Sequence, residues 1–176
     1  MPGLNPAGRG AGHARRALVV ALAGAALAGC AVAPILGELP GRVVEGTGPV
    51  AVDADAARRM IASYREAHGL GAVDLDPALV RVARRQADSM ARANRLGHAV
   101  SGDLSARLAA EGLRRGAEAE NVSAGYPSFE RALLGWERSP RHNDNLLYRP
   151  IRRIGIAAAS APGTRYKTFW ALVMTD

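Results

Sequence analysis

Cysteine is almost absent from this chain of 176 residues, which carries only one, Cys30. A domain with a single cysteine can form no internal disulfide, so packing alone must stabilise its fold. A domain of roughly 120 residues buries enough surface for packing to suffice. The leftover thiol therefore suggests a special use for Cys30 and not a structural cross-link.

Long apolar runs are missing as well. The longest, ALVVALAGAALAG at 17–29, has thirteen residues, whereas a helix needs roughly 20 to cross a bilayer. A permanent transmembrane anchor is therefore not expected. Arginines precede the run and small residues end it, which is typical of an export signal that is cut off.

The end of this signal, Leu27-Ala28-Gly29-Cys30, resembles the lipobox of bacterial lipoproteins. The resemblance implies that Cys30 receives a diacylglycerol and becomes the new amino terminus. Two acyl chains hold a protein to a membrane far better than one. The alternative is a plain export signal cleaved nearby, with Cys30 as an incidental buried thiol. We expect an exported lipoprotein, tethered to a membrane in the periplasm or at the cell surface.

Acidic residues are absent from 1–29, which changes the charge balance after processing. The whole chain has 23 basic and 16 acidic residues, a net charge of +7. Without the three arginines of 1–29, 20 basic and 16 acidic residues remain, a net charge of +4. A moderately basic exported protein is expected to meet anionic lipid or cell-wall polymer and not nucleic acid. We expect a monomer.

Regular periodicity is absent between the signal and the rest of the chain. Residues 31–52 contain three prolines and four glycines, so we expect a flexible tether over 30–52. The folded domain is then expected to cover 53–176. Its apolar content, 48% over the whole chain, is ordinary for one globular domain.

Periodic apolar residues predict four helices, over about 54–68, 76–96, 103–112 and 129–138. Ser128 caps the last of these, and its apolar stripe includes Trp136. This helix ends at Ser139-Pro140, because the residue before a proline avoids helical angles.

Strand patterns appear later in the chain. Alternation predicts a strand near 118–124, and two apolar segments, RRIGIAAAS and YKTFWALVM, predict antiparallel strands joined by a tight loop at 161–164. Helices first and strands late, without regular alternation, indicate an α+β fold.

Three potential metal ligands come from three different elements. His98 follows the second helix, Glu120 lies in the first predicted strand, and His142 follows the tryptophan helix. Two histidines and one carboxylate are the set used by some catalytic zinc sites, which leave a fourth position to water. The alternative is that each residue lies at the end of its element for local reasons.

Other candidates are weaker. Ser123 has Asn121 two residues before it, so it fails the Gly-x-Ser-x-Gly pattern of an exposed nucleophile. Five arginines crowd sixteen residues and could bind phosphate or carboxylate groups, or form a solvated rim. These are Arg138, Arg141, Arg149, Arg152 and Arg153.

The order of these motifs resembles the CAP superfamily (cysteine-rich secretory proteins, antigen 5 and pathogenesis-related-one proteins) in its bacterial SCP-like form. The resemblance covers about 55–173. The segments that carry it are YREAHGLGAVDLDPALVRVARRQADSM, His98, AENVSAG, GWERSPRHNDNLL, RRIGIAA and YKTFWALV. It implies a three-layer α-β-α sandwich with a central antiparallel sheet.

The resemblance also implies a cleft in which His98, His142 and Glu120 meet, with Asn121, Ser139 and Arg141 as neighbours. A turn after Pro140 is expected to present His142. The Asn-Asp-Asn run at 143–145 suits such a turn by its local hydrogen bonds, so we assign it no chemistry.

Three departures limit the transfer. Many eukaryotic members have a second cleft glutamate where this chain has Ser139. Glu137 is no replacement, because it lies about 200° from that position around a helix and is expected to face solvent. Arg141 and Asn143 stand where a glycine and an arginine are often found. The disulfides of the secreted eukaryotic members are absent.

Members of the superfamily are associated with sterol or lipid binding, signalling and, with less support, proteolysis. Our first hypothesis is a binding module whose His98-Glu120-His142 cleft binds a divalent metal such as zinc, or a small or lipidic ligand, because no nucleophile is evident. The second is a zinc-assisted hydrolase of peptide or cell-wall material, with Glu120 as ligand or base. The third is an envelope interaction protein with a vestigial cleft, docking through its arginines.

Overall fold

The described residues of this computed structural model, 48–113 and 116–176, form five strands and five helices. In chain order they are β1 (Gly48–Val50), α1 (Ala54–Ala67), β2 (Asp74–Leu75), α2 (Pro77–Ala93), α3 (Leu104–Ala110), β3 (Glu118–Ala124), α4 (Phe129–Glu137), α5 (Pro140–Leu146), β4 (Arg153–Ala161) and β5 (Lys167–Thr175). The expected export signal, Cys30 and most of the expected tether lie outside the described residues. No helix within 48–113 and 116–176 is long and apolar enough to span a bilayer.

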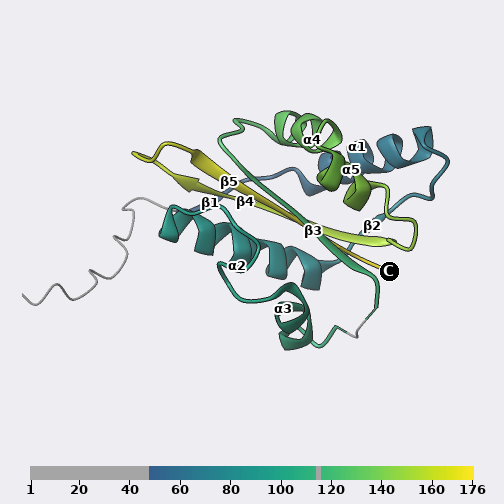
Figure 1. The fold of residues 1–176 in the computed structure, drawn as a ribbon, viewed down its shortest axis with the longest axis horizontal. Helices are drawn as coiled ribbons and strands as arrows, with labels where there is room; N and C mark the ends of the chain where they lie inside the picture. The colour runs from purple at the N-terminus through teal and green to yellow at the C-terminus, as the bar shows by residue number, and fades with distance from the viewer. Residues whose placement is uncertain (1–47, 114–115) are drawn as a thin grey trace, which may run out of the picture. The chain divides into compact units, whose positions relative to one another are not determined.

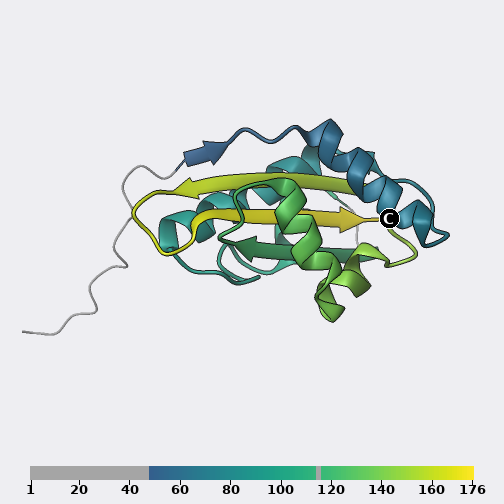
Figure 2. The ribbon, with the colours of Figure 1, turned by 90° about the horizontal axis from the view of Figure 1, so that it is seen from above.

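The strands form one sheet in the order β1-β4-β5-β3, which Figure 2 shows from above. β5 pairs antiparallel with β4 on one side and with β3 on the other. β1 lies antiparallel against the far edge of β4, and β2 pairs with the start of β4 in parallel. The prediction of a strand at 118–124 and of two late antiparallel strands is confirmed.

Both faces of the central strands are apolar, because successive residues of a strand point to opposite sides. Ile156 and Leu172, paired across β4 and β5, belong to the core beneath α1 and α4. Ala157 and Ala171, the next pair, belong to the core against α2. Figure 1 shows α1, α4 and α5 on one face of the sheet and α2 and α3 on the other. This is the expected three-layer α-β-α arrangement.

The predicted helices form, with small differences at their ends. α1 begins after Asp53, whose carboxylate accepts a hydrogen bond from the backbone N–H of Ala56 at 2.8 Å. α2 begins with Pro77 after the cap residue Asp76. It ends at Ala93, earlier than the predicted residue 96, because Asn94 adopts a left-handed conformation with a φ of 44°.

The segment after Ser139 differs from the prediction. We expected a turn, whereas Pro140–Leu146 forms the short helix α5, with Ser139 as its cap residue. α4 does end at Glu137, as the proline requires. The same proline then begins a new helix, because its fixed φ suits the first helical position. Trp136 is 1% exposed and anchors α4 in the core, as expected.

Two short strands were not predicted. β1 lies within the last residues of the segment expected to be a tether, and Gly48, Pro49 and Val50 pair with Ser160, Ala159 and Ala158. Glycine and proline disguise such a strand, and proline is tolerated only because β1 is at the sheet edge. β2 has only two residues, too few for any alternating pattern.

Candidate functional site

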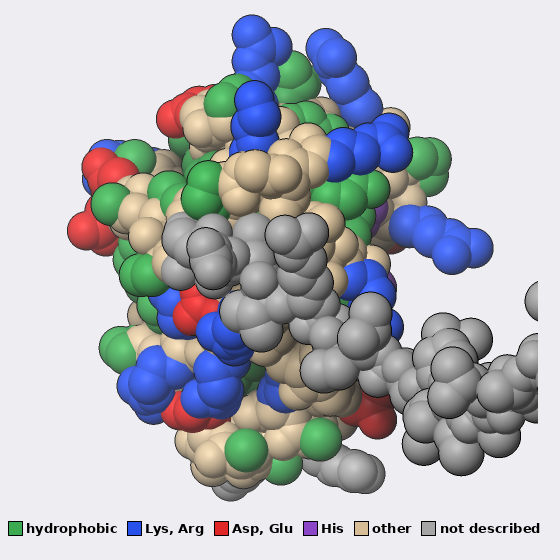
Figure 3. Space-filling model, turned by 90° about the vertical axis from the view of Figure 1, so that its left-hand side faces the viewer, with side chains coloured by type: hydrophobic (Ala, Val, Ile, Leu, Met, Phe, Trp, Pro, Cys, Tyr) green, Lys and Arg blue, Asp and Glu red, His purple; other side chains and the backbone are tan. Residues whose placement is uncertain are grey.

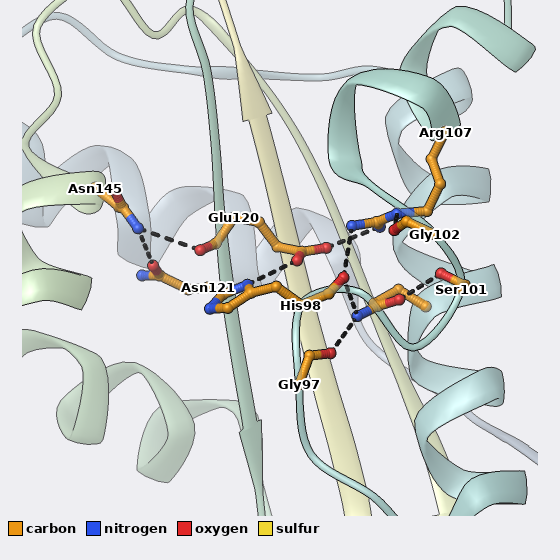
Figure 4. Close-up of polar contacts among 9 residues, drawn as sticks. Gly97, His98, Ser101, Gly102, Arg107, Glu120, Asn121 and Asn145 are labelled. Atoms are coloured by element: carbon orange, nitrogen blue, oxygen red, sulfur yellow. Dashed lines mark hydrogen bonds and ion pairs between the residues drawn. The ribbon is translucent and has the colours of Figure 1, made fainter.

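His98 lies in the loop that follows α2, and buried side chains hold the backbone of this loop. Gln86 of α2 donates hydrogen bonds to the carbonyls of Gly97 at 2.7 Å and His98 at 3.0 Å. Arg107 of α3 donates to the His98 carbonyl at 3.2 Å and to that of Gly102 at 3.0 Å. Figure 4 shows these contacts converging on the loop from α2 and α3. The position of His98 is therefore set by the two helices beneath it.

Glu120 of β3 lies between His98 and Arg107 (Figure 4). One carboxylate oxygen is 2.9 Å from Nδ1 of His98, and the other accepts from Nη1 of Arg107 at 2.8 Å. The side chains of Glu120 and Arg107 are 3% and 5% exposed, whereas that of His98 is 61% exposed. A buried carboxylate needs a charged partner, and Arg107 supplies it. Glu120 thus orients His98 from below and does not line the cleft.

Arg107 was missed by the sequence analysis, although a signal was present. Leu104, Arg107 and Leu108 are spaced i, i+3 and i+4, which places the arginine on the apolar stripe of α3. An arginine on such a stripe indicates buried acceptors, either a carboxylate or backbone carbonyls, because a charge without partners is too costly to bury.

His142 lies in the first turn of α5. Its Nδ1 is 2.9 Å from the hydroxyl oxygen of Ser139. Its carbonyl accepts from Nδ2 of Asn121, which is fully buried in β3, at 3.0 Å. Asn145 in turn donates to Oδ1 of Asn121 at 2.9 Å and to the carbonyl of Glu120 at 3.2 Å. This amide network fastens α5 to β3.

The two histidines line one hollow of about 870 Å³, which we call the cleft. Its other lining residues are Ser139, Pro140, Arg141, Asp144 and Asn145. Ser139 and Arg141 were expected here. Asn121 was expected as a cleft neighbour, but it does not line the cleft. Its buried side chain instead supports α5 through hydrogen bonds to His142 and Asn145. Asp144 and Asn145 were assigned only to a turn, yet they line the cleft because the segment is helical.

Glu137 is partly buried, although we expected it to face solvent. It lies close enough to Tyr64 of α1 to affect that residue. Burial raises the pKa of the Tyr64 phenol, and the charge of Glu137 raises it further. The Tyr64 hydroxyl donates to Oδ1 of Asn143 in α5 at 2.7 Å. Glu137 does not line the cleft.

The arginines that crowd 138–153 do not form one rim. Arg153 pairs with Asp76 at 2.7 Å and also donates to the carbonyl of Asp176. Arg152 donates to the carbonyls of Arg149 and Ile151, both at 2.8 Å. Only Arg141 of the five lines the cleft.

The environment of His142 favours its neutral form. Burial lowers the pKa of the imidazole, and the nearby His98 lowers it further. A neutral ring has a lone pair available on one nitrogen. Since Nδ1 of each histidine is engaged, by Glu120 and by Ser139, Nε2 is the atom left to take a ligand.

The lowered pKa of His142 predicts a pH-dependent stability. The unfolded chain holds more protons than the folded chain between the lowered pKa and about 6.5, so the free energy of unfolding should fall as pH drops through that window. Above about 6.5 both states are neutral at this residue, and its contribution is constant. Denaturant unfolding of metal-free protein between pH 5 and 8 measures this. His142→Asn should lose less stability on acidification than the unmodified chain, and parallel curves would contradict the prediction.

The donor set fits a site with two histidine ligands better than one with three protein ligands. Within 48–113 and 116–176, no three His, Cys, Asp or Glu side chains are grouped so that they could hold a metal ion. Glu120 has both oxygens engaged, so it would act as the hydrogen-bond partner that orients His98. Metal-ligating histidines almost always donate their other ring N–H to a carboxylate, a backbone carbonyl or water.

The family model described as the cysteine-rich secretory protein family (CAP) matches residues 58–174. No curated protein matches the sequence. Among solved structures, an outer surface protein from Borrelia burgdorferi is 17% identical with a TM-score of 0.65, and the match covers 73% of this chain and 97% of that protein.

Two further structures share the fold. An extracellular protein containing an SCP domain from Bacillus anthracis str. Ames is 23% identical with a TM-score of 0.58, covering 73% of this chain and 44% of that one. A cysteine-rich secretory protein from Staphylococcus aureus subsp. aureus Mu50 is 15% identical with a TM-score of 0.56, covering 69% and 37%. This chain thus spans less than half the length of these two proteins.

Proposed function

Because the chain belongs to the cysteine-rich secretory protein (CAP) family, we propose that it is an envelope-tethered binding module whose cleft holds a divalent metal, zinc, between His98 and His142. The observation that carries this proposal is the hydrogen bonding of the two imidazole rings. Both Nδ1 atoms are engaged by neighbouring oxygens, and both histidines line the same hollow. Nε2 of each ring is then the ligating atom.

Each neighbour of the histidines has a defined part in this site. Glu120 makes the Nδ1 position of His98 the protonated one, so its Nε2 carries the lone pair. Ser139 takes the same part for His142 when its hydroxyl oxygen accepts from the Nδ1–H. With two protein ligands, coordination positions remain for water or for oxygen atoms of a ligand, which zinc would polarise as a Lewis acid. Asp144 and Arg141 line the space where such a ligand would lie.

A binding module agrees with this geometry better than a hydrolase does. The hydrolase hypothesis needs Glu120 as a metal ligand or as a base that reaches a water molecule. Glu120 is 5% exposed, and its two oxygens already contact His98 and Arg107. No other acid beside Asp144 lines the cleft among the described residues.

The envelope location rests on the N-terminal segment. The lipobox-like sequence before Cys30 supports export and lipidation. β1 begins at Gly48, so 17 residues, 31–47, separate Cys30 from the sheet. Two of the similar structures are named as an outer surface protein and an extracellular protein, which agrees with an exported domain.

Zinc titration of the purified full-length chain by calorimetry tests the proposed function. We expect one zinc ion per chain, and His98→Ala and His142→Ala should each weaken its binding at least about 100-fold, since removing a ligand costs more than removing a ligand's partner. Glu120→Gln should weaken it by about tenfold, because an amide can accept from only one of the two donors that the carboxylate serves.

His68→Ala is the matched control for this experiment. His68 is exposed after the end of α1, its Nδ1 contacts the carbonyl of Tyr64 at 2.8 Å, and it does not line the cleft. Its replacement should leave the zinc affinity unchanged. The metal site is refuted if zinc produces no heat, or if the cleft variants bind it as well as His68→Ala does.

A further inference from the structure

A second hollow adjoins the cleft on the surface of α4. It has a volume of about 290 Å³, and its lining residues are Tyr126, Arg131, Leu134, Gly135, Arg138 and Ser139; we call it the α4 groove. Ser139 also lines the cleft, so the two hollows meet at this residue. The proposed zinc site uses none of the other residues of the groove.

The shape of the α4 groove follows from the spacing along the helix. Arg131 and Arg138 are seven residues apart, so they emerge from the same side of α4 about 10.5 Å apart along its axis. Gly135 lies between them and has no side chain. The hydroxyl of Tyr126 occupies the place that a Cβ at position 135 would need. The groove is therefore lined by two arginines, and the phenolic hydroxyl of Tyr126 lies against Gly135 between them.

The charges around the groove are unbalanced. Arg131 and Arg138 are exposed, and neither forms an ion pair with a described residue. Arg141, in the adjoining cleft, is also exposed and has no ion pair within the described part of the chain. Asp144 is the only acidic residue among those described that line either hollow. Figure 3 shows basic side chains standing apart from acidic ones at its upper right, over the layer of α1, α4 and α5.

We propose that the α4 groove binds a phosphate group of a ligand whose other part lies in the cleft. The proposal rests on the proposed function only for the part of the ligand that lies in the cleft. Two arginines and a tyrosine hydroxyl offer more donors than the two oxygens of a carboxylate can use. A phosphate monoester has three terminal oxygens for them, and each arginine can contact two in parallel. The partial negative charge at the C-terminal end of α4 opposes the anion, but two full positive charges outweigh it.

A phosphate group of this kind could belong to a lipid headgroup or to a soluble phosphate ester. The apolar side chain of Leu134 lines the groove and offers a surface for acyl chains. Three probes separate the two sources: inorganic phosphate, glycerol 3-phosphate and dihexanoyl phosphatidic acid. All three contain the group that the arginines recognise, and only the last contains acyl chains.

The test is calorimetric titration of zinc-free, full-length protein in a neutral detergent with each probe. We expect saturable binding of at least one probe, and Arg131→Gln with Arg138→Gln should weaken it by about tenfold or more, since each charged hydrogen bond is worth about a factor of ten. Tighter binding of the acylated probe than of glycerol 3-phosphate would identify a lipid, and equal binding a soluble ester.

The matched control carries Arg59→Gln with Arg92→Gln, which changes the net charge equally at exposed positions on α1 and α2. It should change phosphate binding less than about twofold, because neither arginine lines the groove and salt screens exposed charges that do not contact the ligand. His98→Ala with His142→Ala should abolish zinc binding and leave inorganic phosphate binding intact, so the two sites fail separately. The proposal is overturned if no probe binds, or if both arginine pairs weaken binding equally.

Discussion

Replacement of Arg65 by methionine is expected to lower the free energy of unfolding by about 3–5 kcal/mol, because several buried hydrogen bonds from a charged donor are lost, each worth about 1.5–3 kcal/mol. Arg65 is 1% exposed. It donates to the carbonyls of Leu146 at 2.7 Å, Ile151 at 3.0 Å, Gly71 at 3.1 Å and Tyr148 at 3.2 Å. Methionine fills part of the volume but removes the guanidinium donors. The Tyr148 carbonyl keeps the backbone N–H of Ile151 and the Ile151 carbonyl keeps Arg152, whereas the carbonyls of Leu146 and Gly71 lose their side-chain donor. Guanidinium chloride unfolding measures the loss.

Arg59→Met is the matched control for this prediction, because Arg59 is an exposed arginine on the same helix. Its replacement should change stability by less than about 0.5 kcal/mol. Arg65→Lys should fall between the two, since lysine keeps the charge but lacks the planar fork that reaches several carbonyls. Equal stability of Arg65→Met and Arg59→Met would show that this network does not hold the end of α5 to α1.

Replacement of Gly155 by alanine is expected to destabilise the fold by about 3 kcal/mol or more, at the upper end for overpacked cores. A Cβ at this position of β4 would overlap backbone atoms of Leu79 and Val80 in α2. A backbone cannot rotate away as a side chain does, so α2 must move off the sheet. Leu79 is itself fully buried, and its packing would be lost as well. Thermal unfolding followed by circular dichroism measures the effect.

Gly48→Ala is the control for Gly155→Ala, because it adds the same methyl group to another strand. Nothing lies within 4 Å of a Cβ built at Gly48. Its replacement should change stability by less than about 0.5 kcal/mol. If Gly155→Ala proves as stable as Gly48→Ala, the close approach of α2 to β4 is not required by the fold.

Elements with a strong local pattern could be predicted from the sequence. The strand at 118–124 agrees with β3 residue for residue, and α1 and α4 begin where their cap residues Asp53 and Ser128 indicate. Their patterns are local, since an apolar period and a cap lie within a few residues of one another. The short strands β1 and β2 carry no such pattern, because pairing with β4 alone makes them strands.

In the candidate site, too, the residues marked by a local motif were predictable and those that depend on another element were not. His98, Ser139, Arg141 and His142 were proposed from motifs and do line one cleft. The part of Glu120 was not predictable, because it depends on Arg107 in a different element. Pro140 marks a stop and a start equally well, so the segment that carries His142 could be read as a turn or as a helix.

The sequence by itself determined the α+β class, most helices and strands, the family and the histidines of the cleft, because residue type and spacing along the chain carry that information. Only the tertiary structure decided which residues share a face. In the folded chain Glu120 contacts His98 and Arg107, and Arg65 lies among four carbonyls. Arg131 and Arg138 line a groove that meets the cleft at Ser139. These relations join residues from different elements, and the packing of helices against the sheet, which no local pattern specifies, brings them together.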